Sequence, residues 1–252
     1  MSLVEAGLNG HYRLRLGHDL IVDVLPGNRL ETRRRSPSSD SSLNHFLADQ
    51  VIPRLLAHGG DHVLHAGAFR AGDKAILLMG STGRGKSTLA ASFDQAGLPL
   101  VGDDAMIISW ANARPFAKSV YPSLRLLPDS IAALLPATVD TASVADYTPK
   151  RRVSLPIEAS TAALSSKVAA IFAIGEPTTN SDIKVRRLTE AEACIDLVSN
   201  SFALDPSNID GARNRLALAS RLARTVMTFE IRYPRDYAKL PEVRDAILAH
   251  LP

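Results

Sequence analysis

The residues with the clearest chemical signature lie at positions 80–88, where the sequence reads GSTGRGKST. The first eight satisfy the pattern G-x-x-x-x-G-K-[ST] in full. Glycines allow backbone angles that other residues avoid, and they keep side chains away from a bound anion. Successive N–H groups can then converge on phosphate at the positive end of the helix that follows. The pattern therefore predicts a phosphate-binding loop for a nucleotide.

Two side chains of this loop have distinct expected roles. Lys86 reaches the β- and γ-phosphate oxygens, and the Ser87 hydroxyl binds Mg²⁺. The apolar run AILLM before the loop and the helical segment STLAASFDQ after it supply the strand–loop–helix context that the motif requires. We expect Arg84, at a variable position, to face solvent. The sequence predicts binding of ATP or a close relative, with Mg²⁺, through Gly80, Ser81, Thr82, Gly83, Arg84, Gly85, Lys86, Ser87 and Thr88.

An acidic pair, Asp103 and Asp104, ends the apolar segment LPLVG that follows the loop helix. The carboxyl ends of neighbouring parallel strands face the same crevice, so this pair is expected near the loop. Adjacent residues of an extended chain point to opposite sides, so one carboxylate can face the γ-phosphate and the acceptor. The other can reach the Mg²⁺ or a structural partner. Kinase chemistry needs such a carboxylate to orient an acceptor hydroxyl and take its proton. The alternative interpretation is a surface pair in a turn.

Three histidines precede the loop at positions 58, 62 and 65. The Gly59-Gly60 pair separates the first from the others, and the odd spacing places His62 and His65 on opposite faces of a strand. A metal site made of all three is therefore disfavoured. From the residues alone, His65 is expected to be a core or edge residue of a strand.

The surrounding pattern alternates strands and helices and predicts an α/β fold. We expect two short strands within residues 11–25, joined near Gly17, and an exposed loop at 28–42 that includes the arginine run 33–35. A helix follows at 43–60, which Pro53 kinks. Paired strands precede the loop, at 62–69 and 73–80, and a strand at 98–102 follows its helix. Further helices are expected at 128–135, 188–202, 210–224 and 241–251, with Thr189 as a cap, and further strands at 168–175 and 228–234.

Composition limits the classes of protein. The chain has 252 residues, 46% of them hydrophobic, and a net charge of +3, which is too weak to indicate nucleic acid as a partner. A single cysteine, Cys194, excludes an intramolecular disulfide and is expected in the core of a helix. No apolar run approaches the roughly 20 residues of a membrane span, and the N-terminus lacks the order of a signal peptide. We expect a cytoplasmic protein with no membrane partner.

The block HAGAFRAGDKAILLMGSTGRGKSTLAASFDQAGLPLVGDDAMII resembles the catalytic domain of HPr kinase/phosphorylase. The resemblance implies a P-loop fold like that of phosphoenolpyruvate carboxykinase and HPr kinase. It implies that Asp103 is the base that orients the target serine, with Asp104 and Ser87 on the metal side. It also makes His65 a member of the active site together with Lys86.

The whole chain looks similar to compact, stand-alone HPr-kinase-like proteins, some of which accompany lasso-peptide maturation enzymes and phosphorylate a serine of the precursor peptide. On this basis residues 1–60 form a small N-terminal extension and 61–252 the P-loop kinase domain. Basic residues after the acidic pair are candidates for binding phosphate or substrate, and the competing interpretation is that they lie in a solvated loop. They are Arg125, Lys150 and Arg152.

These observations predict an ATP- and Mg²⁺-dependent kinase that phosphorylates a serine on a peptide or small protein, with a flexible peptide as the expected acceptor. The alternatives are an HPr serine kinase, a small-molecule kinase of the same fold and a non-catalytic nucleotide sensor. An ABC-type ATPase is disfavoured because no LSGGQ-like segment is found. The sequence leaves the formation of a homo-oligomer open.

Overall fold

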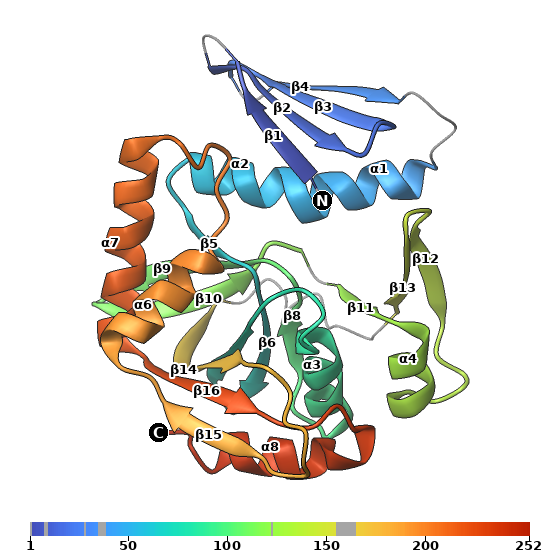
Figure 1. Ribbon diagram of the computed structural model, residues 1–252, viewed down its shortest axis with the longest axis vertical. Coiled ribbons are helices and arrows are strands. Elements are labelled where there is room, and N and C mark those ends of the chain that lie inside the picture. The colour runs from blue at the N-terminus through green and yellow to red at the C-terminus, as the bar shows by residue number, and fades with distance from the viewer. Residues whose placement is uncertain (1, 8–9, 28, 35–38, 122, 155–164) are drawn as a thin grey trace.

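Long apolar segments of the sequence form the middle of a mixed nine-stranded sheet (Figure 1). The computed structural model describes residues 2–7, 10–27, 29–34, 39–121, 123–154 and 165–252. The strands of this sheet are β5 (His62–Leu64), β6 (Ala66–Ala71), β7 (Lys74–Met79), β8 (Leu100–Gly102), β9 (Met106–Ala111), β10 (Arg114–Ser119), β14 (Ser166–Ile174), β15 (Lys184–Arg187) and β16 (Met227–Arg232).

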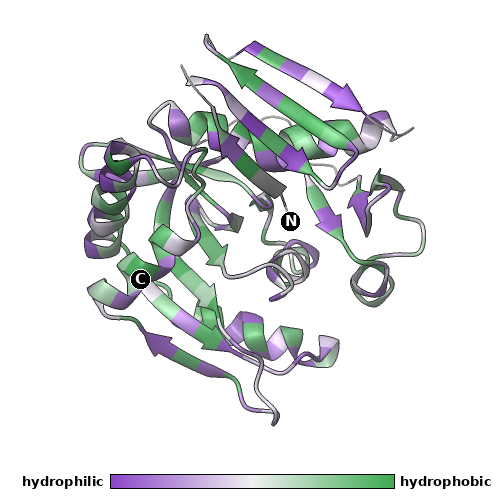
Figure 2. Ribbon diagram, turned by 45° about the horizontal axis from the view of Figure 1, so that its top comes forward, coloured by the Kyte–Doolittle hydropathy of each residue, from purple (hydrophilic) through white to green (hydrophobic). Residues whose placement is uncertain are grey.

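The sheet is parallel only at its centre. Its main path runs β5-β9-β10-β14-β7-β6-β8, and β14 is parallel to both β7 and β16. Figure 2 shows the central strands mainly in hydrophobic colours. Both faces are apolar because consecutive residues of β7 point to opposite sides: Ile76 and Leu78 join one core, and Leu77 and Met79 the other.

Helices cover both faces of the central sheet. On one side lie α3 (Lys86–Gln95) and α8 (Leu240–Leu248), and on the other α6 (Glu190–Ser199) and α7 (Ile209–Thr225). Thr189 caps α6 as expected, in a capping box with Glu192. Cys194 is half-buried in α6 and packs against the second core. None of the helices in the described part of the chain is long and apolar enough to cross a membrane.

The N-terminal region is a separate antiparallel sheet that lies on a helical segment (Figure 1). Its apolar face packs on that segment through residues such as Leu14, Val22 and Phe46. The strands are β1 (Ser2–Ala6), β2 (Tyr12–Leu16), β3 (Leu20–Leu25) and β4 (Arg29–Arg34), and the helical segment consists of α1 (Asp40–Phe46), the π-helical turn η2 (Leu47–Val51) and α2 (Ile52–His58).

The expected loop at 28–42 is wrong for residues 29–34, which form β4. The arginines there are accommodated because β4 is an exposed edge strand and Arg33 donates to the buried carboxylate of Asp23 at 2.7 Å. Arg35 lies outside the described residues. The predicted pair of strands joined near Gly17 is confirmed by β2 and β3.

A third, three-stranded sheet lies beside α3. It consists of β11 (Leu124–Leu126), β12 (Thr141–Ala145) and β13 (Thr148–Val153). The helix α4 (Pro128–Leu134) comes between β11 and β12 in the chain, and the short 3-10 turn η3 (Tyr237–Lys239) comes after β16. Asp146, between β12 and β13, accepts hydrogen bonds from the Ser39 amide and from the Ser39 and Ser42 hydroxyls. These hydrogen bonds connect the β12–β13 hairpin to the N-terminus of α1.

The mixed α/β class is as predicted, but one topological detail differs. β8 is not a parallel neighbour of β7: it pairs antiparallel with β6, and β6 pairs antiparallel with β7. Two antiparallel steps restore the direction, so β8 still runs the same way as β7. The carboxyl ends of both strands therefore reach the same edge of the sheet, and this positions the acidic pair near the loop.

Candidate active site

The glycine-rich segment 80–87 connects β7 to α3, and its backbone explains why it needs glycine. Gly80, Gly83 and Gly85 have φ angles of 143°, 83° and 94°, which L side chains rarely adopt. A Cβ at Gly80 would also lie 2.9 Å from the carbonyl oxygen of Ile174 at the end of β14. Gly85 is the N-cap of α3, so the N-terminus of this helix lies at the end of the loop, beside the cleft.

Lys86 is the first residue of α3, and its ammonium group folds back over the loop. The side chain is buried, and Nζ donates to the carbonyl oxygens of Gly80 at 2.7 Å and Ser81 at 3.4 Å. A third contact, of 3.1 Å, joins Nζ to Nε2 of His65. Burial lowers the pKa of Lys86, although the charges of Asp104 and Asp103 oppose the shift.

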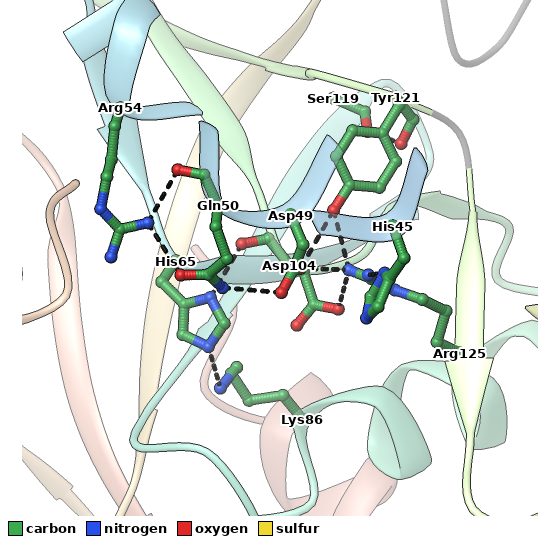
Figure 3. A network of polar contacts seen from close by, with 10 residues as sticks. All are labelled: His45, Asp49, Gln50, Arg54, His65, Lys86, Asp104, Ser119, Tyr121 and Arg125. Carbon is green, nitrogen blue, oxygen red and sulfur yellow. Dashed lines mark hydrogen bonds and ion pairs between the residues drawn. The ribbon is translucent and has the colours of Figure 1, made fainter. Parts of the chain in front are cut away.

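The protonation of His65 follows from its partners. Nδ1 lies 3.0 Å from the Asp104 carbonyl oxygen, which can only accept, so Nδ1 carries the proton. Nε2 then holds a lone pair and accepts from Lys86 (Figure 3). Burial, followed by the charge of Lys86, lowers the pKa of His65, in agreement with a neutral ring. His65 therefore contacts the loop lysine and the acidic pair at the same time.

Asp104 lines the cleft and is held by a buried guanidinium. Its backbone has a φ of 70°, a left-handed conformation that is uncommon outside glycine. Its carboxylate forms an ion pair with Arg125 on β11, and Arg125 also donates to Asp49 at 2.7 Å and to the Tyr121 hydroxyl at 2.7 Å. Burial lowers the pKa of Arg125, but the charges of Asp104 and Asp49 outweigh it and raise the pKa overall.

Two members of this network come from the region expected to be a mere extension. Asp49 lies on the π-helical turn η2, and His45 on α1 accepts from Arg125 through Nδ1 at 2.7 Å. Burial raises the pKa of Asp49, but Arg125 overcomes this effect and brings it to about 2. Burial, aided by Arg125, lowers the pKa of His45 to about 4. A π-helical turn is often found at functional sites, and here it directs Asp49 into the cleft beside His45 (Figure 3).

Asp103 lies behind the cleft and does not line it. Its side chain is fully buried, with Oδ1 close to Gly67, where an added Cβ would come within 3.3 Å. Among the described residues, neither carboxylate oxygen makes a hydrogen bond of normal geometry. Burial, followed by the charge of Asp104, raises the pKa of Asp103 to about 7, while the charge of Arg125 and, after it, neighbouring Ser87 oppose the rise. An unpartnered buried carboxyl group is costly, and its place beside Ser87 is suited to a cation.

The cleft has a volume of about 460 Å³ and extends from the loop in two directions. One arm is charged and lies between the helical segment and the β12–β13 hairpin. Its lining includes His45, Asp49, His65, Asp104, Arg125, Tyr147 and Lys150. The other arm lies between α4 and the segment after β16, and its lining includes Leu127, Asp129, Ser130, Tyr233, Pro234, Arg235, Asp236, Tyr237 and Leu240.

The structure separates the three basic candidates. Arg125 and Lys150 line the charged arm. Arg152 is paired with Arg125 across β11 and β13, but its side chain is exposed and does not line the cleft. Arg84 lines the cleft and does not simply face solvent as expected, because it forms an ion pair with Glu176. Thr88 lines the cleft too, with its hydroxyl 3.0 Å from that of Ser130.

Sequence reasoning missed several lining residues. His45 and Asp49 are four residues apart in a helical segment, a spacing that places two polar side chains on one face. The sequence YPRDY follows β16, which is parallel to β14 and β7 and so ends at the same edge as the loop. The spacing of His45 and Asp49 is visible in the sequence itself. The position of YPRDY can be interpreted only when the order of the strands is known.

The residues present fit a magnesium ion bound with the nucleotide. No cluster of three His, Cys, Asp or Glu side chains suited to a metal occurs within the described ranges. A magnesium ion on phosphates needs only one or two carboxylates, with phosphate oxygens and water as its other ligands. Ser87 and the unpartnered Asp103, with Asp104 nearby, supply groups of this kind.

Comparisons with known proteins show no family for this chain. No protein-family model matches the sequence, and no curated protein matches it. Among solved structures, the chain is similar to the Hpr(Ser) kinase/phosphatase from Coxiella burnetii, with a TM-score of 0.38 and 14% sequence identity. The alignment covers 74% of this chain and 97% of that one. A similarity of this size assigns no function, so the function is inferred from the site.

Proposed function

We propose that this chain is an ATP- and Mg²⁺-dependent kinase that transfers the γ-phosphoryl group to a serine hydroxyl. The observation that carries the proposal is the convergence of Lys86, His65 and Asp104 at one end of the glycine loop. A cation for the phosphates thus lies on one side of this histidine, and on its other side lies the backbone of Asp104, whose carboxylate lines the same cleft. A non-catalytic sensor needs the first of these groups but has no use for the second.

In the proposed reaction, the serine oxygen forms a bond to the γ-phosphorus while the bond from that phosphorus to the β,γ-bridging oxygen breaks. ADP leaves, and the proton of the hydroxyl passes to a cleft carboxylate. Lys86 exchanges its contacts with Gly80 and Ser81 for phosphate oxygens. Lys150 adds positive charge on the acceptor side. Bound Mg²⁺, held through Ser87 and Asp103, would neutralise the charge on the phosphates.

The positions of the two aspartates favour exchanging the roles expected from the resemblance. Asp104 lines the cleft and its carboxylate is positioned by the ion pair with Arg125, so it is suited to orient the acceptor hydroxyl. Asp103 is enclosed beside Ser87 and is suited to the magnesium side. We therefore propose Asp104 as the carboxylate that receives the proton.

For the acceptor we propose a serine on a peptide or small protein, with a lasso-type precursor peptide as the first candidate. The charged arm is bounded by His45, Tyr147 and Lys150, and the His45 and Tyr147 rings stack 5.7 Å apart. Side chains on both sides of this arm, from α1 and from the β12–β13 hairpin, can contact an extended segment that lies between them. A flexible peptide loses entropy on ordering, so its affinity should be modest.

The test is transfer from γ-labelled ATP, with Mg²⁺, to a serine-containing precursor peptide and to HPr in direct competition. Lys86→Ala should abolish transfer and weaken ATP binding, because the phosphates lose their nearest cation. Lys74→Ala, at the half-buried start of β7 and outside the cleft, is the matched control and should retain activity. Transfer by Lys86→Ala at the wild-type rate would overturn the kinase proposal. Efficient transfer to HPr with none to the peptide would overturn only the peptide acceptor.

A further inference from the structure

The arm of the cleft opposite the charged network has a different chemical character. Two large hydrophobic side chains that remain exposed, Leu127 and Tyr237, lie here, with 41% and 37% of their surfaces exposed. Leu240 and Pro234 add further apolar surface. Exposed apolar groups that gather inside a cleft, next to a few polar atoms, are typical of a small-molecule site.

This arm is joined to the phosphate loop by hydrogen bonds. The Thr88 hydroxyl, on the first turn of α3, lies 3.0 Å from the Ser130 hydroxyl, which lies 3.0 Å from that of Tyr237. Arg235 donates to the carbonyl oxygen of Gly83 at 2.9 Å. The Tyr233 hydroxyl lies 3.3 Å from where a Cβ of Gly85 would be. The apolar arm is therefore positioned relative to the loop before any ligand binds.

The arrangement fixes which end of a nucleotide each arm can receive. His65, Lys86 and Asp104 occupy the end of the loop where transfer would take place. A triphosphate that lies along the loop with its γ-phosphate at that end must direct its nucleoside the other way. A nucleoside offers two flat π-faces and ribose hydroxyls, and the second arm offers apolar side chains and the carboxylates of Asp129 and Asp236.

We propose that this arm, between the start of α4 and residues 233–240, is the nucleoside subsite. The base packs on Tyr237 and Leu127, and the carboxylates of Asp129 and Asp236 are placed to accept from the ribose hydroxyls. The inference rests on the proposed function, because it takes the charged arm to be the transfer end. Stacking tolerates different bases because each has a π-face. ATP and GTP should therefore bind with affinities within about tenfold of each other.

The test compares ATP with inorganic tripolyphosphate, which has the charges but no nucleoside, by calorimetry with Mg²⁺. The wild-type chain should bind ATP more tightly than tripolyphosphate. In Tyr237→Ala the affinity for ATP should fall about 5- to 100-fold, the range for loss of one base–aromatic stack, while that for tripolyphosphate stays unchanged. Leu127→Ala should show the same pattern more weakly. Leu216→Ala removes an exposed hydrophobic side chain of α7 outside the cleft and should leave the affinity for ATP unchanged.

The outcomes separate the subsite from the function. Equal wild-type affinities for ATP and tripolyphosphate would overturn the nucleoside subsite and leave the kinase proposal standing. An unchanged ATP affinity in both Tyr237→Ala and Leu127→Ala would overturn it as well, as would a loss of ATP affinity in Leu216→Ala equal to that in Tyr237→Ala. Failure of the wild-type chain to bind either compound would overturn both the subsite and the proposed function.

Discussion

Lys86 and His65 form a direct contact in which the lysine Nζ donates to the histidine Nε2 across 3.1 Å. The direction of this bond is fixed from the far side of the ring, where Nδ1 donates to the Asp104 carbonyl oxygen. Lys86 and the backbone of the acidic pair are therefore connected through one neutral imidazole. A change at any of the three residues should affect the other two.

The first prediction concerns the support that His65 gives to the ammonium group. Phenylalanine at this position fills similar space but removes the acceptor of Lys86. A buried ammonium with one acceptor fewer is less stable, so the pKa of Lys86, already lowered by burial, should fall further. In His65→Phe the loss of ATP affinity at alkaline pH should begin at a lower pH than in the wild type. Calorimetry with ATP between pH 7 and 10 measures this. Coincident pH profiles would show that the contact does not stabilise the charged lysine.

The second prediction separates the two aspartates. Asp104→Asn should lower the transfer rate by about 10²-fold or more, the scale of a general base, with little change in ATP affinity. Asp103→Asn should mainly raise the Mg²⁺ concentration needed for half-maximal rate, because Asp103 lies beside Ser87 and outside the cleft. Rates measured against Mg²⁺ concentration give both values. The reverse pattern would restore Asp103 as the base, as the family resemblance implies.

The third prediction concerns stability at the centre of the network. Arg125→Ala leaves the carboxylates of Asp49 and Asp104 without their shared cation, and breaking a buried pair typically costs about 3–5 kcal/mol. Arg152→Ala is the matched control, because Arg152 faces Arg125 across β11 and β13 but is exposed. Its effect should stay within about 0.5 kcal/mol. Urea unfolding of both variants provides the comparison. Equal effects would show that the ion pairs of Arg125 contribute no more than a surface residue.

How far the sequence predicts this site depends on whether the signal is local. The loop at 80–87 and the cap at Thr189 are found where predicted, because both are short patterns with local physical causes. Placing the acidic pair near the loop was sound, although the reason differs: β8 reaches the correct edge through two antiparallel pairings with β6 between.

What the sequence did not reveal depends on contacts between distant segments. Asp49 and Arg125 are 76 residues apart, and nothing in either neighbourhood indicates an ion pair. The strand β4 was read as a loop because its arginines and polar residues mask the alternation of an exposed edge strand. The boundary expected at residue 60 did not anticipate that His45 and Asp49 line the same cleft as the loop.

The last prediction is the pH dependence of stability, for which the sign follows from four buried groups. Burial lowers the pKa of His62 to about 4, and burial together with the charge of Arg125 lowers the pKa of His45 to about 4. The pKa of His65 is also lowered, by burial and then by the charge of Lys86. As the pH falls below about 6.5, the unfolded chain protonates these histidines while the folded chain does not. Each therefore lowers the free energy of unfolding as the pH falls, by up to about 1.4 kcal/mol per pH unit. Asp103 opposes them, because its folded pKa of about 7 lies above the unfolded value of 3.8 and the folded chain holds the extra proton.

We expect a net loss of stability from pH 6.5 to 4.5, measured as the free energy of urea unfolding. Compared with the wild type, the slope should be shallower in His62→Asn, a site away from the cleft, and steeper in Asp103→Asn. Three equal slopes would contradict the assignment of these groups.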